Sequence, residues 1–156
     1  MAMRSDEPIA HVEGDADVSL EGLDSVHTLL SQYWTVVEEA LPCPVDATWR
    51  ALFDTAVCEI AGNIVRHAYS DNPGSATFHV SFDCYPDGME ATMRDRGSPY
   101  VLMPAIGRPD MRDALDNIEL DHGWGLPIAH AASDGLEYER LPDGHNQWVI
   151  SKRLPA

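Results

Sequence analysis

The sequence has few cysteines, few basic residues and no long apolar run. Its three cysteines, Cys43, Cys58 and Cys84, are odd in number and widely spaced, which argues against a disulfide framework or a paired zinc site and indicates reduced thiols. No stretch reaches the roughly 18 apolar residues that a membrane-spanning helix needs. The N-terminus turns acidic at once and lacks an apolar segment, so it does not resemble a secretory signal. We therefore expect a cytoplasmic protein.

Basic residues are outnumbered by acidic ones, 10 to 26, and the formal net charge is −16. A surface of that sign repels the phosphates of nucleic acids and of anionic membranes, so we expect neither as a direct partner. Two interpretations of the acidity stay open: attraction to a basic protein surface, or solubility alone.

The size of the chain favours one domain. At 156 residues, of which 44% are hydrophobic, it can bury one sizeable core but is too short for two ordinary domains. We expect a disordered tail at 1–8 and a single domain over 9–156. Residues 96–122 contain three prolines and two glycines and should be mostly loop, and a loop that long in a small domain is usually functional or disordered.

Hydrophobic periodicity predicts two helices in the first half of the chain. Residues 9–20 should include an edge strand. Apolar residues then recur at spacings of three and four over 23–41, where Pro42 ends the helix. A second helix is predicted over 46–70, with Asp46 as its N-cap.

The second half of the chain predicts strands and one short helix. Strands are expected over 76–85 and 89–94, joined by a Pro-Asp-Gly turn, and over 136–140 and 147–152. A helix is expected over 125–132. This order predicts an α/β (α+β) two-layer sandwich, with a mixed, mostly antiparallel sheet and helices on one face.

Four polar residues of the second helix lie three or four positions apart and should share a face opposite its apolar line: Glu59, Asn63, Arg66 and His67. An Asn in mid-helix is unfavourable, and Gly62 beside it costs about 1 kcal/mol relative to Ala. Local rules broken together are typical of a functional site. On spacing alone, a solvated polar face with an Arg–Glu pair is the competing interpretation.

Two later segments also carry candidate chemistry. Asp95 stands where a strand ends, so a buried carboxylate there can accept a hydrogen bond from an exocyclic amine, and Gly97 lets a flat ring approach the backbone. An ordinary Asp-x-Gly turn is the alternative. Gly123 and Gly125 open a helix, where backbone amides bind phosphates. That segment matches neither the Walker A pattern nor the dinucleotide fingerprint.

Taken in this order, the three segments resemble the N, G1 and G2 boxes of the GHKL (Bergerat-fold) ATPases. The closest resemblance is to anti-sigma-factor serine-protein kinases, which carry a histidine-kinase-like ATPase domain, and it covers about residues 20–154. The matching runs are Glu59-x3-Asn63-x2-Arg66, Asp95-x-Gly97-x-Pro99 and Gly123-Trp124-Gly125-Leu126.

The resemblance implies a role for each position. Glu59 would be the general base on a serine hydroxyl of the partner, and Asn63 would bind the Mg²⁺ that bridges the ATP phosphates. Asp95 would read the adenine amino group, with Gly97 making room for the ring. The segment 98–122 would be a lid. The remaining nucleotide-binding positions would lie near the phosphates: Gly123, Gly125, Leu126 and Arg66, with Arg108 or Arg112.

The chain departs from the family pattern at two of these places. Trp124 replaces the usual small or polar residue of the glycine box, and Asn146 stands near where relatives often carry a phosphate-contacting Thr.

Two functions follow from the resemblance. The first is an ATP-binding anti-sigma factor with serine/threonine-protein kinase activity toward an anti-anti-sigma partner, and with a sigma factor as a second partner. The alternative is a non-catalytic module of the same fold that sequesters a protein partner. A homodimer packed by Tyr33 and Trp34 is the alternative to placing these rings in the core.

Overall fold

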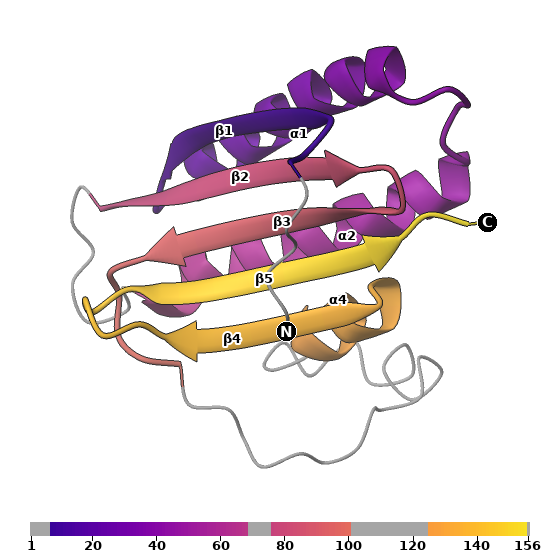
Figure 1. Cartoon of the computed structure of the whole chain (residues 1–156). Coiled ribbons are helices and arrows are strands. Elements are labelled where there is room, and N and C mark those ends of the chain that lie inside the picture. The colour runs from indigo at the N-terminus through magenta and orange to yellow at the C-terminus, as the bar shows by residue number, and fades with distance from the viewer. Residues whose placement is uncertain (1–6, 69–75, 101–124, 156) are drawn as a thin grey trace.

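The computed structural model describes residues 7–68, 76–100 and 125–155. Its five strands form one sheet in the order β1-β2-β3-β5-β4, and every neighbouring pair is antiparallel. Figure 1 shows the helices behind this sheet, on one of its faces. The predicted two-layer α/β sandwich is therefore confirmed. The elements are β1 (Ala10–Asp17), α1 (Leu20–Ala40), α2 (Ala47–Asn63), the π-helical turn η1 (Ile64–Ala68), β2 (Thr77–Tyr85), β3 (Gly88–Asp95), α4 (Gly125–Ala132), β4 (Gly135–Arg140) and β5 (Asn146–Arg153).

Helix α1 begins three residues before its apolar pattern does, because Ser19 caps it. The Ser19 side chain accepts a hydrogen bond from Gly22 N at 3.2 Å. A Cβ atom at Gly22 would lie 1.6 Å from the carbonyl oxygen of Asp17. Only glycine therefore lets the first turn of α1 pack against the end of β1.

Helix α2 begins as predicted, with the Asp46 carboxylate accepting a hydrogen bond from Trp49 N at 3.1 Å. The regular α-helix ends at Asn63 and continues as the π-helical turn over 64–68. Insertions of this kind are frequent at functional sites. The last two residues of the predicted helix, 69 and 70, lie outside the described ranges.

Aromatic rings of α1 and α2 form the centre of the core. Tyr33 and Trp34 are 0% and 3% exposed, so they are core residues in this chain. The rings of Trp49 and Phe53 stack at 5.9 Å. Each indole N–H has a partner: Trp34 donates to an Asp54 carboxylate oxygen and Trp49 to the carbonyl oxygen of residue 153, both at 2.8 Å. Among the described helices, none is long and apolar enough to cross a membrane.

The sheet register aligns three polar residues in one row. Asp95 at the end of β3 pairs with Asn146 at the start of β5, and Asn146 pairs in turn with Arg140 at the end of β4. Strand β4 lies at one end of the strand order. The row therefore runs from the middle of the sheet to its edge.

Candidate nucleotide site

Asp95 is a buried carboxylate whose two oxygens differ in their hydrogen bonding. It is 2% exposed. Its Oδ1 accepts hydrogen bonds from Gly97 N at 2.8 Å and from Asn146 Nδ2 at 2.9 Å. Its Oδ2 is buried and has no hydrogen-bond partner among the residues that the structure describes. A buried polar atom without a partner is costly, so it marks a place where a ligand donor would bind well.

The protonation of Asp95 reflects two opposed influences. Burial raises the pKa of this carboxyl group above its ordinary value, while the hydrogen bonds from Asn146 and from the backbone of Gly97 act in the opposite direction. The positive charge of Arg140 also favours the ionised form. The hydrogen bonds thus help to keep an acceptor charged in a buried position.

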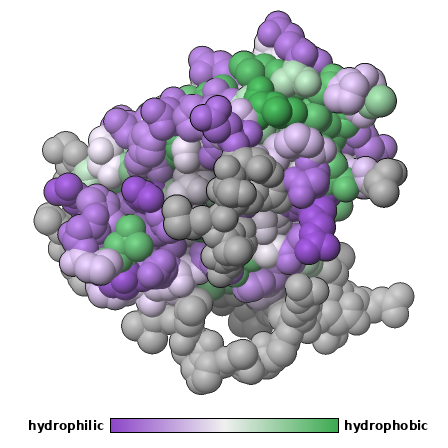
Figure 2. Space-filling view, viewed as in Figure 1, coloured by the Kyte–Doolittle hydropathy of each residue, from purple (hydrophilic) through white to green (hydrophobic). Residues whose placement is uncertain are grey.

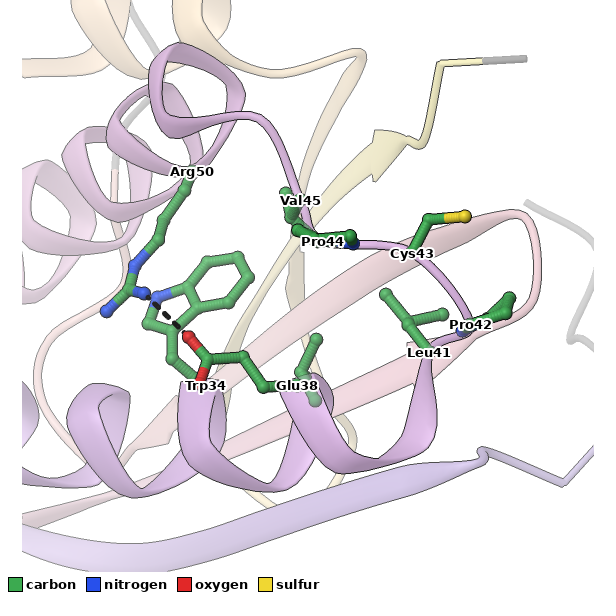
Figure 3. Close-up of a pocket in the computed structure, with 9 residues that line it drawn as sticks. Trp34, Glu38, Leu41, Pro42, Cys43, Pro44, Val45 and Arg50 are labelled. Carbon is green, nitrogen blue, oxygen red and sulfur yellow. Dashed lines mark ion pairs between the residues drawn. The ribbon is translucent and has the colours of Figure 1, made fainter.

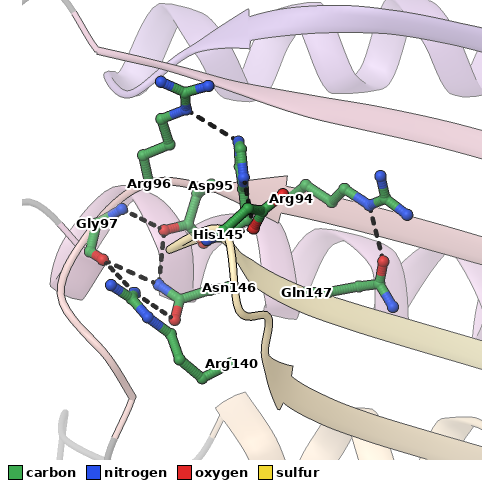
Figure 4. Close-up of polar contacts among 9 residues, drawn as sticks. Arg94, Asp95, Arg96, Gly97, Arg140, His145, Asn146 and Gln147 are labelled. Carbon is green, nitrogen blue, oxygen red and sulfur yellow. Dashed lines mark hydrogen bonds and ion pairs between the residues drawn. The ribbon is translucent and has the colours of Figure 1, made fainter.

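Side chains from β4 and β5 surround this carboxylate (Figure 4). Asn146 is 2% exposed, and its oxygen accepts hydrogen bonds from the hydroxyl of Tyr138 and from Arg140 Nη1. Arg140 Nη1 also donates to the carbonyl oxygen of Gly97 at 2.8 Å. The end of β3 is therefore held by residues from two other strands.

Tyr100 links this group to helix α2. Its backbone N–H donates to the Tyr138 hydroxyl at 2.8 Å. Burial raises the pKa of Tyr100, and the side chain of Asn63 opposes that shift. Its ring also packs against Trp148, with centroids 5.2 Å apart. Tyr100 thus lies between Asn63 of α2 and the residues of β4 and β5 that surround Asp95.

The predicted residues of α2 differ in exposure. Asn63, the last residue of the helix, is 8% exposed, Glu59 one turn earlier is half-buried, and Arg66 in the π-helical turn is exposed. The solvated-face interpretation therefore does not describe Asn63. The spacing argument assumed that only one side of the helix is covered, whereas α2 packs against α4 as well as against α1 and the sheet.

The phosphate end of the predicted site is described only in part. Gly125 is the first residue of α4. Leu126 is half-buried and packs against the hydrophobic core. The other predicted positions lie outside the described ranges: Arg108, Arg112, Gly123, Trp124 and nearly all of the lid at 98–122. The side chain of His67 is not described either.

A separate hollow of about 420 Å³ lies at the corner between α1 and α2. Figure 2 shows apolar residues at the surface in that region, and Figure 3 shows the lining side chains. Arg50 lies over the Trp34 ring at 4.7 Å and pairs with Glu38 at 3.5 Å. None of the predicted site residues that the structure describes lines this hollow.

Three contributors to the site escaped the sequence analysis: Tyr100, Tyr138 and Arg140. No local motif marks them, because they come from the start of a loop and from an edge strand. Asn146 drew attention only as a departure from the family pattern. These residues lie together because of the register between the strands. Hydrophobic alternation does not specify that register for half-exposed strands.

The fold and this geometry agree with the comparisons to known proteins. Residues 23–152 match the family model of the histidine kinase-like ATPase domain. The chain therefore belongs to this family of ATPase domains.

Particular relatives fall within the same class. The serine-protein kinase RsbW of Bacillus mycoides (strain KBAB4) is 27% identical over 85 residues, which are 53% of this chain and 51% of that protein. The chain thus spans about half the length of this curated relative.

Two solved structures are similar in fold. The RsbU and RsbW domains of Rv1364c from Mycobacterium tuberculosis give a TM-score of 0.61 at 17% identity, covering 92% of this chain and 32% of that one. The SiaB–SiaC complex of Pseudomonas aeruginosa gives 0.58 at 12% identity, covering 92% and 89%. At such identities the likeness concerns the fold alone.

Proposed function

We propose that this chain binds ATP with Mg²⁺ and acts as an anti-sigma factor with serine-protein kinase activity toward an anti-anti-sigma protein. The observation that carries the proposal is the open, buried Oδ2 of Asp95. Adenine has an exocyclic amino group that would donate a hydrogen bond to this oxygen, so the acceptor of the site fits the base. Membership of an ATPase domain family supports the same ligand.

The residues of α2 would serve the triphosphate end. The amide oxygen of Asn63 is a hard ligand of the kind that Mg²⁺ takes, and Glu59 lies one turn away with partial access to solvent. Bound Mg²⁺ would neutralise the charge of the phosphates. Glu59 would accept the proton of a serine hydroxyl supplied by the partner. Gly97 would admit the ring beside Asp95.

The phosphates would lie near the start of α4. Gly123, Gly125 and Leu126 precede or begin this helix, whose backbone amides favour anions. Arg66, in the π-helical turn that follows α2, would supply positive charge.

The proposed partners are proteins. The similar kinase RsbW is named for a protein substrate, and SiaB is named in a complex with SiaC. We propose a serine of an anti-anti-sigma protein as the acceptor. A sigma factor with a basic surface would complement the net charge of −16. A single domain over 9–156, a lid at 98–122, a homodimeric assembly and a cytoplasmic location belong to the same proposal.

A non-catalytic binding module is the second candidate. One observation favours it: the side chain of Asn63, the proposed metal ligand, faces Tyr100, whose pKa it lowers against the effect of burial. A module of this kind would hold its partner without phosphoryl transfer.

Binding is tested first. Calorimetry with ATP and Mg²⁺ should give saturable binding by the wild-type protein and loss of the Mg²⁺-dependent part in Asn63→Ala. An unchanged affinity in that variant would refute the role of Asn63. No ATP binding by the folded wild-type protein would refute the proposed function.

Catalysis is tested separately. Labelled ATP is incubated with the protein and with candidate antagonist proteins, beside Glu59→Ala as the matched control. Transfer that disappears in Glu59→Ala supports the kinase. ATP binding without transfer to any candidate supports the non-catalytic module.

A further inference from the structure

The side-chain amide of Asn146 is held in one orientation by two donors from β4. A guanidinium has no acceptor, so the Asn146 atom 3.0 Å from Arg140 Nη1 must be the oxygen. The Tyr138 hydroxyl accepts from Tyr100 N, and it therefore directs its own proton to the same oxygen. The amide nitrogen is thereby turned toward three acceptors: Asp95 Oδ1 at 2.9 Å, Ser98 O at 3.0 Å and Gly97 O at 3.2 Å.

This orientation determines what Asp95 can offer a ligand. Two donors, from Gly97 N and Asn146 Nδ2, occupy Oδ1 and leave Oδ2 as the single open acceptor. With the Asn146 amide reversed, its oxygen would face three acceptors and the carboxylate would lose a donor. Only the Gly97 N–H would then hold Oδ1, and the charged form of Asp95 would be less favoured.

Arg140 holds the loop after β3 as well. The nitrogen that orients Asn146 also donates to Gly97 O at 2.8 Å. One side chain at the end of an edge strand thus contacts both the amide beside the carboxylate and the backbone that follows it. Arg140 on β4 and Asp95 on β3 lie on opposite sides of β5, so Arg140 acts on Asp95 through Asn146 of β5.

We propose that Arg140 and Tyr138 of β4 are positioning residues for base recognition. Acting through Asn146, they set Asp95 so that Oδ2 alone meets the exocyclic amino group of the nucleotide. The inference rests on the proposed function, that the chain binds ATP. The inference makes a narrower claim than the proposed function. It states that β4 controls discrimination between a purine that carries an amino group at this position and one that lacks it.

The test compares ATP with purine riboside triphosphate, which lacks the amino group. Affinities are measured by calorimetry with Mg²⁺ on the full chain. Wild-type protein should bind ATP about tenfold more tightly than the analogue, the effect of about one well-made hydrogen bond. In Arg140→Met and Asn146→Leu the affinity for ATP should fall by about that factor while the affinity for the analogue stays within about twofold. Tyr138→Phe, which loses only a hydroxyl, should shift the ratio less and in the same direction.

Arg94→Met is the matched control. Arg94 precedes Asp95 directly, but its guanidinium turns away to Gln147 at 2.7 Å (Figure 4). The substitution is the same as at Arg140, and we expect the wild-type ratio of affinities. Thermal unfolding of each variant identifies any that do not fold, and Tyr138→Phe then carries the test.

The outcomes separate the two proposals. A ratio that falls toward one in the Arg140 and Asn146 variants, but not in Arg94→Met, supports the positioning role. A wild-type ratio in folded Arg140→Met, Asn146→Leu and Tyr138→Phe overturns it while ATP binding stands. An equal loss for both nucleotides also overturns it, because that loss is structural. Wild-type protein that binds neither nucleotide refutes the proposed function itself.

Discussion

Asp95 is a carboxylate that the described part of the fold buries without satisfying all of its hydrogen-bonding capacity. The carboxylate is 2% exposed, and among the described residues only one of its oxygens has a hydrogen-bond partner. Its raised pKa means that folding disfavours the charged form, so this residue lowers the stability of the fold wherever it is ionised. Costs of this kind are typical of sites built for a ligand.

The first residue-scale prediction concerns the pH dependence of ATP binding. The adenine amino group donates to the ionised form, so binding should lower the pKa of Asp95. Affinity should therefore increase as pH rises through the elevated Asp95 pKa and level off above it. Calorimetry on the wild type and Asp95→Asn, from the lowest pH at which both stay folded up to pH 8, checks this. The variant should bind at least about tenfold more weakly, and this part of its pH dependence should be absent. The same pH profile in both proteins would contradict the role.

The second residue-scale prediction concerns the thiols. Burial raises the pKa of Cys58 and of Cys84 to about 11 each, so at pH 8 only about one in a thousand of either is thiolate. Cys43 is exposed. A colorimetric thiol reagent at pH 8 should therefore modify one thiol quickly in the native protein and three after denaturation. Cys43→Ser should remove the fast phase. A second fast thiol in the native protein would contradict the burial of the other two.

Among the elements, β1 is joined to β2 by a ladder of histidines and carboxylates. His11 Nδ1 lies 2.6 Å from an Asp83 oxygen, and His79 Nδ1 lies 2.8 Å from an Asp15 oxygen. Both Nε2 atoms approach Glu13, at 3.3 and 3.4 Å. The edge strand is thus held in register partly by groups that titrate.

The ladder predicts a pH-dependent contribution to stability. The hydrogen bond to Asp83 raises the folded-state pKa of His11 above 6.5. Its stabilising effect is therefore complete below pH 6.5 and is lost as pH rises through the folded-state value. Because His11 is 44% exposed, the contribution should not exceed about 0.5 kcal/mol. Urea unfolding should show a larger difference between the wild type and His11→Gln at pH 6 than at pH 8.5. An equal difference at both pH values would contradict this origin.

A second prediction at the scale of elements concerns the junction of β1 and α1. Gly22→Ala would force a methyl group against the carbonyl oxygen of Asp17, which is backbone and cannot yield. We expect a loss of about 2–3 kcal/mol in the free energy of unfolding, although alanine favours a helix. Gly14→Ala is the control, because its methyl group would meet the flexible end of Leu29 at 2.9 Å. It should cost less than about 1 kcal/mol. Equal effects in chemical denaturation would contradict the close-approach explanation.

Local chemistry explains why most elements were predictable. Asp46 caps α2, and a turn at 86–87 joins β2 to β3. The π-helical turn after Asn63 was not anticipated, because periodicity does not distinguish it from α-helix over five residues. The early start of α1 depends on Ser19, which precedes the apolar pattern.

At the scale of the whole molecule, the site is assembled from segments far apart in the chain. The order of three short motifs singled out Asn63 and Asp95 as candidates, through resemblance to a family. The same approach could not find Tyr138 or Arg140, because their relation to Asp95 exists only once β3, β5 and β4 are in register.

The last prediction is also at this scale. Strand β4 is at the end of the strand order and its residues are only partly buried, so its backbone should open more readily than that of β3. If Tyr138 and Arg140 brace the base site, ATP should slow amide hydrogen exchange in β4. The protection should be lost in Asp95→Asn. Exchange in β4 that ATP leaves unchanged in the wild-type protein would contradict the coupling.

A brace made from an edge strand also has a reciprocal effect. If β4 braces the base site, whatever tightens β4 against β5 raises the affinity for nucleotide by the same factor by which nucleotide tightens β4. A protein that docks along that border of the sheet would then adjust nucleotide affinity without touching the nucleotide.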